Sequence, residues 1–158
     1  MNELRENETE YFHLVGFDQS AVKGLIDDRN PLASATFARQ DPVLKNAVMP
    51  YELFNVEKQK EAVFEQIRMK EYSDSPPRLG SFFLFDNSEL AKTKNQDWFQ
   101  GKRVLCKVRL LQGKTFKVDS FWLNCKPENY EQNARKYWSG EMSQNPAPEI
   151  IFDGMIQL

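Results

Sequence analysis

A pair of prolines separates the clearest helical pattern in this chain from the strand-like pattern that follows it. Residues 56–72 carry an apolar stripe at helical spacing, and Asn55 can cap their first turn. Pro76 and Pro77 cannot continue a helix, and residues 78–85 then have the apolar content of a buried strand. The chain therefore changes from helix to strand within a few residues.

The remaining expected elements are mixed irregularly along the chain. Further strands are expected at residues 11–15 and 149–158, a half-exposed hairpin at 103–118 with its turn at Gln112-Gly113-Lys114, and helices at 88–96 and 127–139. Residues 18–50 have only a weak pattern, which fits short helical turns or a long ligand-covering loop. Because no regular βαβ alternation is present, we expect an α+β fold.

The length and composition limit the possible functions. With 158 residues and 41% hydrophobic content, the chain fits one compact domain, and its first ten residues are expected to be flexible. A net charge of −2 gives no overall attraction to nucleic acid or membranes. One histidine and two cysteines exclude a metal site of several His or Cys ligands within the chain, so no metal cofactor is expected.

The sequence favours a cytoplasmic protein without a membrane segment. Its N-terminal residues are polar and acidic, unlike a secretory signal. The longest apolar stretch, Phe82 to Phe85, is far shorter than the ~20 residues that span a bilayer. Cys106 and Cys125 are expected to be free thiols.

Familiar catalytic motifs are missing, but a basic face is present. Gly113-Lys114-Thr115 resembles the end of a phosphate-binding loop, but Val108 stands where that motif needs a glycine. The strand around Arg103 alternates basic and apolar residues, so its cations form either a solvated face or a track for a phosphate backbone. That basic face consists of Lys102, Arg103, Lys107, Arg109 and Lys117.

Polar residues stand at the edges of three expected apolar strands. They are His13 in Tyr11-Phe12-His13, Arg78 and Ser81 in Pro77-Arg78-Leu79-Gly80-Ser81-Phe82-Phe83, and Glu149 in Pro148-Glu149-Ile150-Ile151-Phe152. A packed sheet can hold such side chains rigidly while exposing their head groups. Each also has a structural interpretation: a core histidine, an arginine paired with an acid, a small strand residue and a solvated edge charge.

These motifs resemble the ADP-ribosyltransferase fold. That fold is a split two-sheet scaffold that binds NAD between its sheets. More narrowly, the chain is similar, from His13 to the C-terminus, to a family of small uncharacterised bacterial proteins with that fold. The segments that carry this similarity are Phe64 to Arg68, Pro77 to Phe83, Ala134 to Gly140 and Pro148 to Gly154. The resemblance implies a single ADP-ribosyltransferase-like domain over residues 1–158.

The resemblance also implies roles for individual residues. His13 would bind the adenosine ribose, Arg78 and Ser81 a phosphate or the nicotinamide ribose, and Glu149 the 2′-hydroxyl of the nicotinamide ribose as the catalytic carboxylate. The chain lacks a Ser-Thr-Ser triplet, and Ala147 stands where a second acidic residue or Gln is common, which argues against an arginine acceptor. An aromatic face for nicotinamide could come from Phe82, Tyr137 or Trp138, although helical spacing favours core positions for the last two.

A single carboxylate suits this chemistry. Cleavage of the nicotinamide–ribose bond passes through an oxocarbenium-like state, which a nearby carboxylate stabilises by about 3 kcal/mol. The resemblance therefore implies an NAD-dependent ADP-ribosyltransferase that modifies a protein, RNA or DNA. By analogy it would be a toxin of a toxin–antitoxin or antiphage system, with an antitoxin as partner. The alternatives are an NAD glycohydrolase and a non-catalytic nucleotide- or partner-binding module on the same fold.

Overall fold

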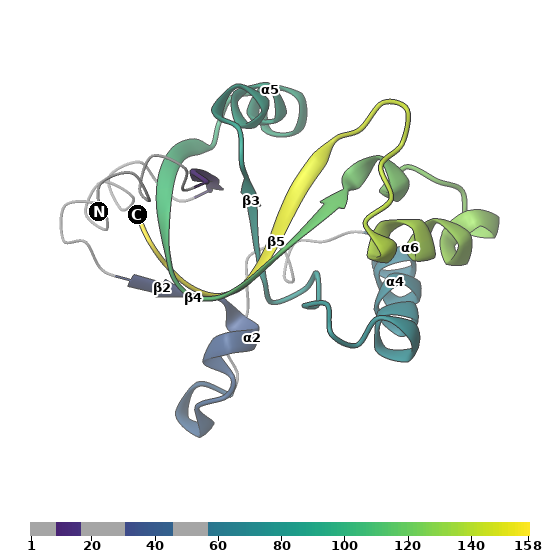
Figure 1. Cartoon of the computed structure of the whole chain (residues 1–158), viewed down its shortest axis with the longest axis horizontal. Helices are drawn as coiled ribbons and strands as arrows, with labels where there is room; N and C mark the ends of the chain where they lie inside the picture. The colour runs from purple at the N-terminus through teal and green to yellow at the C-terminus, as the bar shows by residue number, and fades with distance from the viewer. Residues whose placement is uncertain (1–8, 17–30, 46–56) are drawn as a thin grey trace.

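The computed structural model describes residues 9–16, 31–45 and 57–158, which form an α+β fold (Figure 1). The strands are β1 (Tyr11–Val15), β2 (Pro31–Ala33), β3 (Phe82–Phe85), β4 (Val104–Asp119) and β5 (Pro148–Gln157). The α-helices are α2 (Ala35–Ala38), α4 (Lys58–Glu71), α5 (Ser88–Phe99) and α6 (Tyr130–Ser139). The 3₁₀ helices are η1 (Pro42–Leu44), η2 (Ser120–Leu123) and η3 (Pro127–Asn129). The α+β class is therefore confirmed.

The described strands form one antiparallel sheet that closes on itself. Its order is β2-β5-β3-β1-β4, and β4 also pairs with β5, so that four strands make a small barrel with β2 as an extra strand. Closure is possible because β4 is long: Val104 to Val108 pair with β1, and Arg109 to Asp119 pair with β5. Where two sheets were expected, the described strands are joined by hydrogen bonds into one.

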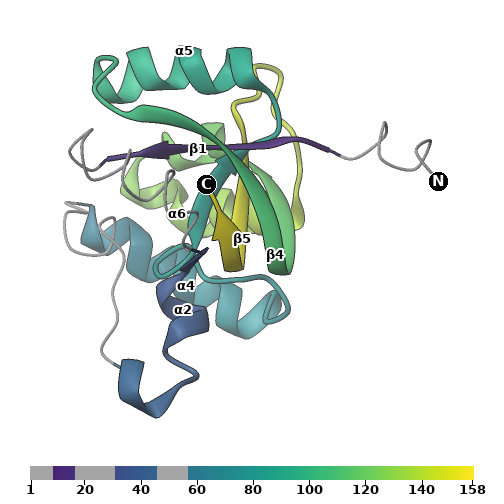
Figure 2. The same ribbon diagram turned by 90° about the vertical axis from the view of Figure 1, so that its left-hand side faces the viewer.

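The expected hairpin at residues 103–118 is wrong, because these residues form one strand, β4, which bends near Gly113 without folding back on itself (Figures 1 and 2). The pairing register shifts between Leu110 and Gln112, and Gly113 then lies opposite Gly154. Gly113 has a φ of 129°, a conformation that favours glycine. Two facing glycines let the backbones approach closely, which permits a sharp bend in a continuous strand. The basic and apolar residues of the expected hairpin therefore lie along a single strand.

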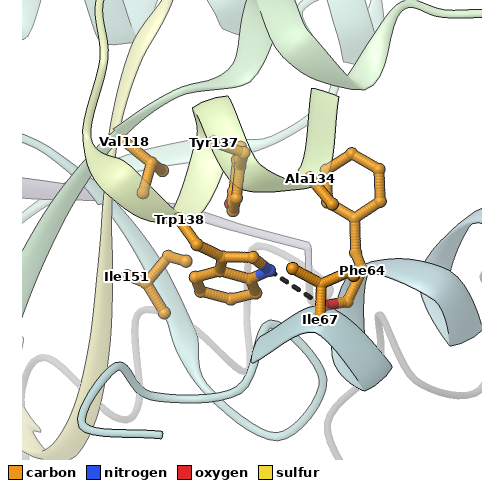
Figure 3. Packing of buried hydrophobic residues seen from close by; sticks show 7 residues of the cluster. All are labelled: Phe64, Ile67, Val118, Ala134, Tyr137, Trp138 and Ile151. Carbon is orange, nitrogen blue, oxygen red and sulfur yellow. Dashed lines mark hydrogen bonds between the residues drawn. The ribbon is translucent and has the colours of Figure 1, made fainter. Parts of the chain in front are cut away.

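The largest buried cluster fills the space between the barrel and two helices. Figures 1 and 3 show α4 and α6 side by side, with Trp138 between α6 and the chain of α4. The indole Nε1 of Trp138 donates a hydrogen bond of 2.9 Å to the carbonyl oxygen of Phe64. The cluster consists of Phe64, Ile67, Val118, Ala134, Tyr137, Trp138 and Ile151. The core positions expected for Tyr137 and Trp138 are therefore confirmed.

A second buried cluster joins β3, β4 and β5. It consists of Phe82, Leu84, Val108, Ile150, Phe152 and Ile156. Helix α5 covers a third cluster of Leu14, Phe85 and Ala91, which ties it to β1 and β3. The barrel is thus packed by side chains from all four of its strands.

Several element boundaries agree with the sequence. The strand at residues 11–15 is confirmed, β5 begins one residue before the expected Glu149, and α4 ends at Glu71 just before the prolines. Helix α5 runs three residues further than expected, to Phe99, and a 3₁₀ turn at Pro127 leads into α6. Gly140 ends α6 in the left-handed conformation. Asn55 and Val56 lie outside the described residues.

The predicted start of the strand at Arg78 is wrong, and this changes the position of a candidate site residue. The strand expected from Arg78 begins only at Phe82, and the preceding residues form a turn. Gly80 has a φ of 89°, which interrupts the extended backbone. Arg78 therefore lies on a turn between α4 and β3. It is not on the sheet itself.

The structure also tests the expectations for the weakly patterned stretch, the cysteines and a membrane segment. Between residues 31 and 45 the chain forms β2, α2 and η1. Residues 18–30 and 46–50 of the weakly patterned stretch lie outside the described residues, as do residues 1–8. Cys106 and Cys125 are free, as expected. Among the helices described here, none combines the length and apolar character needed to cross a bilayer.

Candidate functional site

Two of the predicted residues, Arg78 and Glu149, come together in a buried polar cluster. Glu61 of α4 and Tyr137 of α6 complete it, and we call these four residues the Arg78 cluster. They come from four separate segments that meet beside the helical core. Each of the four is no more than 6% exposed. Such complete burial of charged groups requires compensating partners within the protein.

Glu61 provides the strongest of these partnerships. The Nε atom of Arg78 lies 3.1 Å from both carboxylate oxygens of Glu61, and Nη2 lies 3.0 Å from Oε1. A guanidinium and a carboxylate joined by several charge-assisted hydrogen bonds form the most directional ion pair available to proteins. The pair therefore fixes the plane and direction of the Arg78 side chain.

The rest of the guanidinium is directed at Tyr137 and Glu149. Nη1 of Arg78 donates a hydrogen bond of 2.6 Å to the Tyr137 hydroxyl and lies 3.8 Å from Oε1 of Glu149. The guanidinium carbon also lies 5.2 Å from the centroids of the Phe83 and Tyr137 rings. Burial raises the pKa of the Tyr137 hydroxyl, although Arg78 opposes that change. Tyr137 thus stays neutral and accepts from Arg78.

Glu149 is held less completely than Glu61. Its side chain is 8% exposed, and within the described residues its polar contact is the 3.8 Å approach of Arg78, with no hydrogen bond. Burial raises the pKa of the Glu149 carboxyl, Arg78 and Lys94 lower it, and Glu61 raises it further. A carboxylate with unfilled hydrogen-bonding capacity in a buried position is able to accept a donor from a ligand.

His13 lies near this cluster without touching it. Its Nδ1 is 2.9 Å from the carbonyl oxygen of Phe83, and its ring meets Phe82 edge to face at 5.5 Å. Burial lowers the pKa of His13, with a smaller contribution from Arg103. A neutral ring with Nδ1–H as donor leaves Nε2 as an acceptor. Phe83 connects the two predicted regions, since its carbonyl contacts His13 and its ring lies under Arg78.

Ser81 and Phe82 occupy buried positions beside the turn. The Ser81 side chain is 1% exposed, and its hydroxyl has no hydrogen-bond partner among the described residues. Phe82 belongs to the second buried cluster and is 5% exposed. Tyr137 is fully buried. Neither aromatic ring therefore presents an open face for stacking in this arrangement.

Reasoning from the sequence missed Glu61, although a signal was present. Glu61 precedes Phe64 by three residues, so the two lie on the same side of α4, where both are buried. An acidic residue on an apolar helix face needs a buried partner. That signal predicts a buried cation, but it does not identify Arg78, which is 17 residues away.

A separate pocket of about 340 Å³ opens beside the bend of β4 and β5. It is lined by Phe37, Gln40, Arg68, residues 73–77, Gly113, Lys114 and Asp153, and contains none of the predicted site residues. Its charges are mixed, and the Arg68 guanidinium is bound by Glu65 and the Ser75 carbonyl. The pocket therefore favours neither anions nor cations.

The basic face predicted along β4 is partly neutralised. Lys107 pairs with Glu10 at 2.7 Å, and Lys117 pairs with Asp86 at 3.0 Å. The Arg103 guanidinium lies 4.3 Å from the centroid of the Phe99 ring. Within the described ranges, no three His, Cys, Asp or Glu side chains gather closely enough to hold a metal ion.

Comparison with known proteins identifies a family. A search of curated proteins finds no match to the chain. A family model described as "Protein of unknown function (DUF2441)" matches residues 4–158, which is nearly the whole chain. That description names no fold and no activity. The chain belongs to the DUF2441 family.

Proposed function

We propose that this protein is an NAD-dependent ADP-ribosyltransferase in which Glu149 acts on the nicotinamide ribose. The observation that carries the proposal is the state of the Glu149 carboxylate, which is buried beside Arg78 and receives no hydrogen bond from the described residues. A ribose 2′-hydroxyl is a donor that would satisfy it. The position of Glu149 at the start of the last strand agrees with the role implied by the sequence resemblance.

The proposed reaction breaks the bond between C1′ of the ribose and the nicotinamide nitrogen. Nicotinamide leaves with the bonding electron pair, an acceptor atom bonds to C1′, and the acceptor releases its proton. Positive charge develops on the ribose in the transition state, and ionised Glu149 stabilises it through the 2′-hydroxyl. Such a contribution is about 3 kcal/mol, or roughly a hundredfold in rate.

The other predicted residues take supporting roles in this proposal. Nη1 of Arg78 lies on the Glu149 side of the guanidinium and would contact a phosphate or the same ribose. His13 would offer Nε2 to the adenosine ribose. The buried hydroxyl of Ser81 would find its missing partner in the ligand. Either Phe82 or Tyr137 would stack on nicotinamide after the surrounding side chains shift.

The ADP-ribosyltransferase-like fold is part of the proposal. The bend at Gly113 and Gly154 divides the closed sheet into two parts, which would serve as the two sheets of that fold.

The acceptor would be a protein or a nucleic acid of the cytoplasm. The ion pairs of Lys107 and Lys117 reduce the positive charge available to a nucleic acid. By analogy, the activity would be that of a toxin controlled by a partner antitoxin.

The test uses NAD labelled in its adenylate phosphate, incubated with the purified protein and a cell lysate. Label should enter protein or nucleic acid with the wild-type chain and with the Glu141→Gln control, in which an exposed acid is changed. Glu149→Gln should reduce the transfer about a hundredfold. Release of nicotinamide without labelled product would instead indicate an NAD glycohydrolase. If neither labelled product nor free nicotinamide forms at any NAD concentration, the proposal that this protein is an enzyme is excluded.

One observation favours a second candidate, a non-catalytic binding module. Three of the four residues of the Arg78 cluster are satisfied by one another, as in a structural network. Such a module would bind a nucleotide without cleaving it. Calorimetry with NAD or ADP-ribose, combined with a nicotinamide assay, separates the two candidates because only the enzyme consumes its ligand.

A further inference from the structure

Glu61 controls the direction in which Arg78 presents its guanidinium. It contacts Nε and Nη2 of Arg78 at 3.1 and 3.0 Å, and the two side chains are each 5% exposed. These contacts occupy one whole edge of the guanidinium. The opposite side, at Nη1, is left for Tyr137 and Glu149.

This arrangement prevents a full ion pair between Arg78 and Glu149. A guanidinium can bind a carboxylate with two parallel hydrogen bonds, which would satisfy both oxygens of Glu149. In the observed geometry the nearest approach of Arg78 to Glu149 is that of Nη1, at 3.8 Å, which is too long for a hydrogen bond. The hydrogen bond of 2.6 Å to the Tyr137 hydroxyl further restrains that atom.

We propose that Glu61 is a positioning residue, which keeps Arg78 from pairing fully with Glu149 and so leaves the Glu149 carboxylate open to a ligand hydroxyl. The proposal rests on the proposed function of Glu149 and assigns to Glu61 no contact with substrate. The positioning role follows from competition between two buried carboxylates for one guanidinium. Glu61 makes the shorter contacts with Arg78, so Arg78 is directed toward Glu61. Without Glu61, Arg78 is attracted to Glu149.

The charged and titratable groups around Glu149 determine how its ionisation responds. They are Arg78 on the turn, Glu61 on α4, Lys94 on α5 and Tyr137 on α6. The negative charge of Glu61 raises the pKa of Glu149, whereas Arg78 lowers it. Replacing Glu61 with Gln removes the first effect and strengthens the second. Both changes lower the pKa of Glu149.

The experiment compares wild type, Glu61→Gln and the matched control Glu65→Gln. Glu65 makes a similar carboxylate–guanidinium pair with Arg68 on the same helix, but it lies outside the Arg78 cluster. Carbon-13 NMR of labelled glutamate side chains follows the titration of Glu149, whose signal is identified by its loss in Glu149→Gln. In Glu61→Gln the midpoint should move to lower pH, and kcat for NAD cleavage should fall about a hundredfold. Glu65→Gln should change neither.

Unchanged titration and unchanged kcat in folded Glu61→Gln would overturn the proposal. Should this variant fail to fold, Glu61→Asp serves in its place, because it keeps the charge and withdraws the carboxylate by one methylene. A positioning role then predicts a large loss of kcat, whereas a purely electrostatic role predicts wild-type kcat. Absence of NAD cleavage by the wild type would contradict the proposed function, while the titration would still test Glu61.

Discussion

Gly113 of β4 and Gly154 of β5 stand opposite each other at the bend of the barrel, with no space for a side chain between them. A Cβ atom added to Gly154 would overlap the carbonyl oxygen of Gln112 and lie 2.9 Å from the Cα of Gly113. These neighbours are backbone atoms, which cannot move aside as a flexible side chain would. Closure of the barrel therefore depends on this glycine pair.

We predict that Gly154→Ala destabilises the protein by at least about 2 kcal/mol, since the strands must separate to admit a methyl group. Gly140→Ala is the control, because its added Cβ would lie 3.7 Å from the nearest atom, the Lys117 carbonyl oxygen. The control should lose only about 1 kcal/mol, the cost of a left-handed conformation for alanine. Urea denaturation measures both. Equal losses would contradict the role assigned to the glycine pair.

Arg78→Met is predicted to cost about 3–5 kcal/mol, because it removes the guanidinium between two buried carboxylates. Arg135→Met provides the comparison. Arg135 pairs with Glu71 at 3.0 Å, but the two side chains are 47% and 42% exposed, so its loss should change stability by less than about 1 kcal/mol. Urea denaturation of both variants tests the contrast. A small effect at Arg78 would show that the cluster does not contribute to stability.

The sequence predicted local elements well and their long-range pairing poorly. β1 was predicted correctly because an apolar run ending at Gly16 defines a strand by itself. The hairpin was wrong because a glycine between apolar runs suits a turn and a bend equally well. Pairing with β5 decides between a turn and a bend at Gly113, and the β5 residues that pair there lie about forty positions further along the chain. No local pattern around Gly113 contains that information.

The candidate site shows the same division. Polar residues at strand edges were recognisable, and Arg78 and Glu149 do lie together. The resemblance placed Arg78 on a strand, whereas Gly80 puts it on a turn, from which its side chain reaches Glu61 and Tyr137. Ion pairs formed across a turn and between helices depend on the three-dimensional packing, which residue spacing does not specify.

Asp119 is predicted to stabilise the loop that leads into Glu149. It is fully buried, and its carboxylate accepts hydrogen bonds from the backbone N–H groups of Phe121, Ser143 and Ala147 at 3.0, 2.7 and 2.8 Å. Burial opposes ionisation, but these donors outweigh it and lower the pKa of Asp119. Asp119→Asn should cost about 2 kcal/mol, because its amide nitrogen replaces an acceptor.

The lowered pKa of Asp119 also predicts a pH dependence. In the unfolded chain this carboxyl gains a proton as the pH falls through about 4, while in the folded protein it resists protonation. Its contribution to stability is therefore present above that pH and is lost as the pH falls toward the folded-state pKa. Urea denaturation between pH 3 and pH 7 should show this loss in wild type and in the exposed control Asp97→Asn. Asp119→Asn should lack this part of the dependence.

Glu149→Gln is predicted to stabilise the protein at neutral pH while reducing the proposed transfer from NAD about a hundredfold. Because the pKa of Glu149 is raised in the fold, the folded state prefers the protonated carboxyl, and ionisation at pH 7 lowers stability. Gln removes that cost, so the melting temperature of Glu149→Gln at pH 7 should exceed that of wild type. The difference should disappear below about pH 4, where the Glu149 carboxyl of the wild type is protonated in both the folded and the unfolded state. A gain in stability on loss of a charge is typical of functional residues. A lower melting temperature at pH 7 would instead show that Glu149 serves as a structural partner of Arg78.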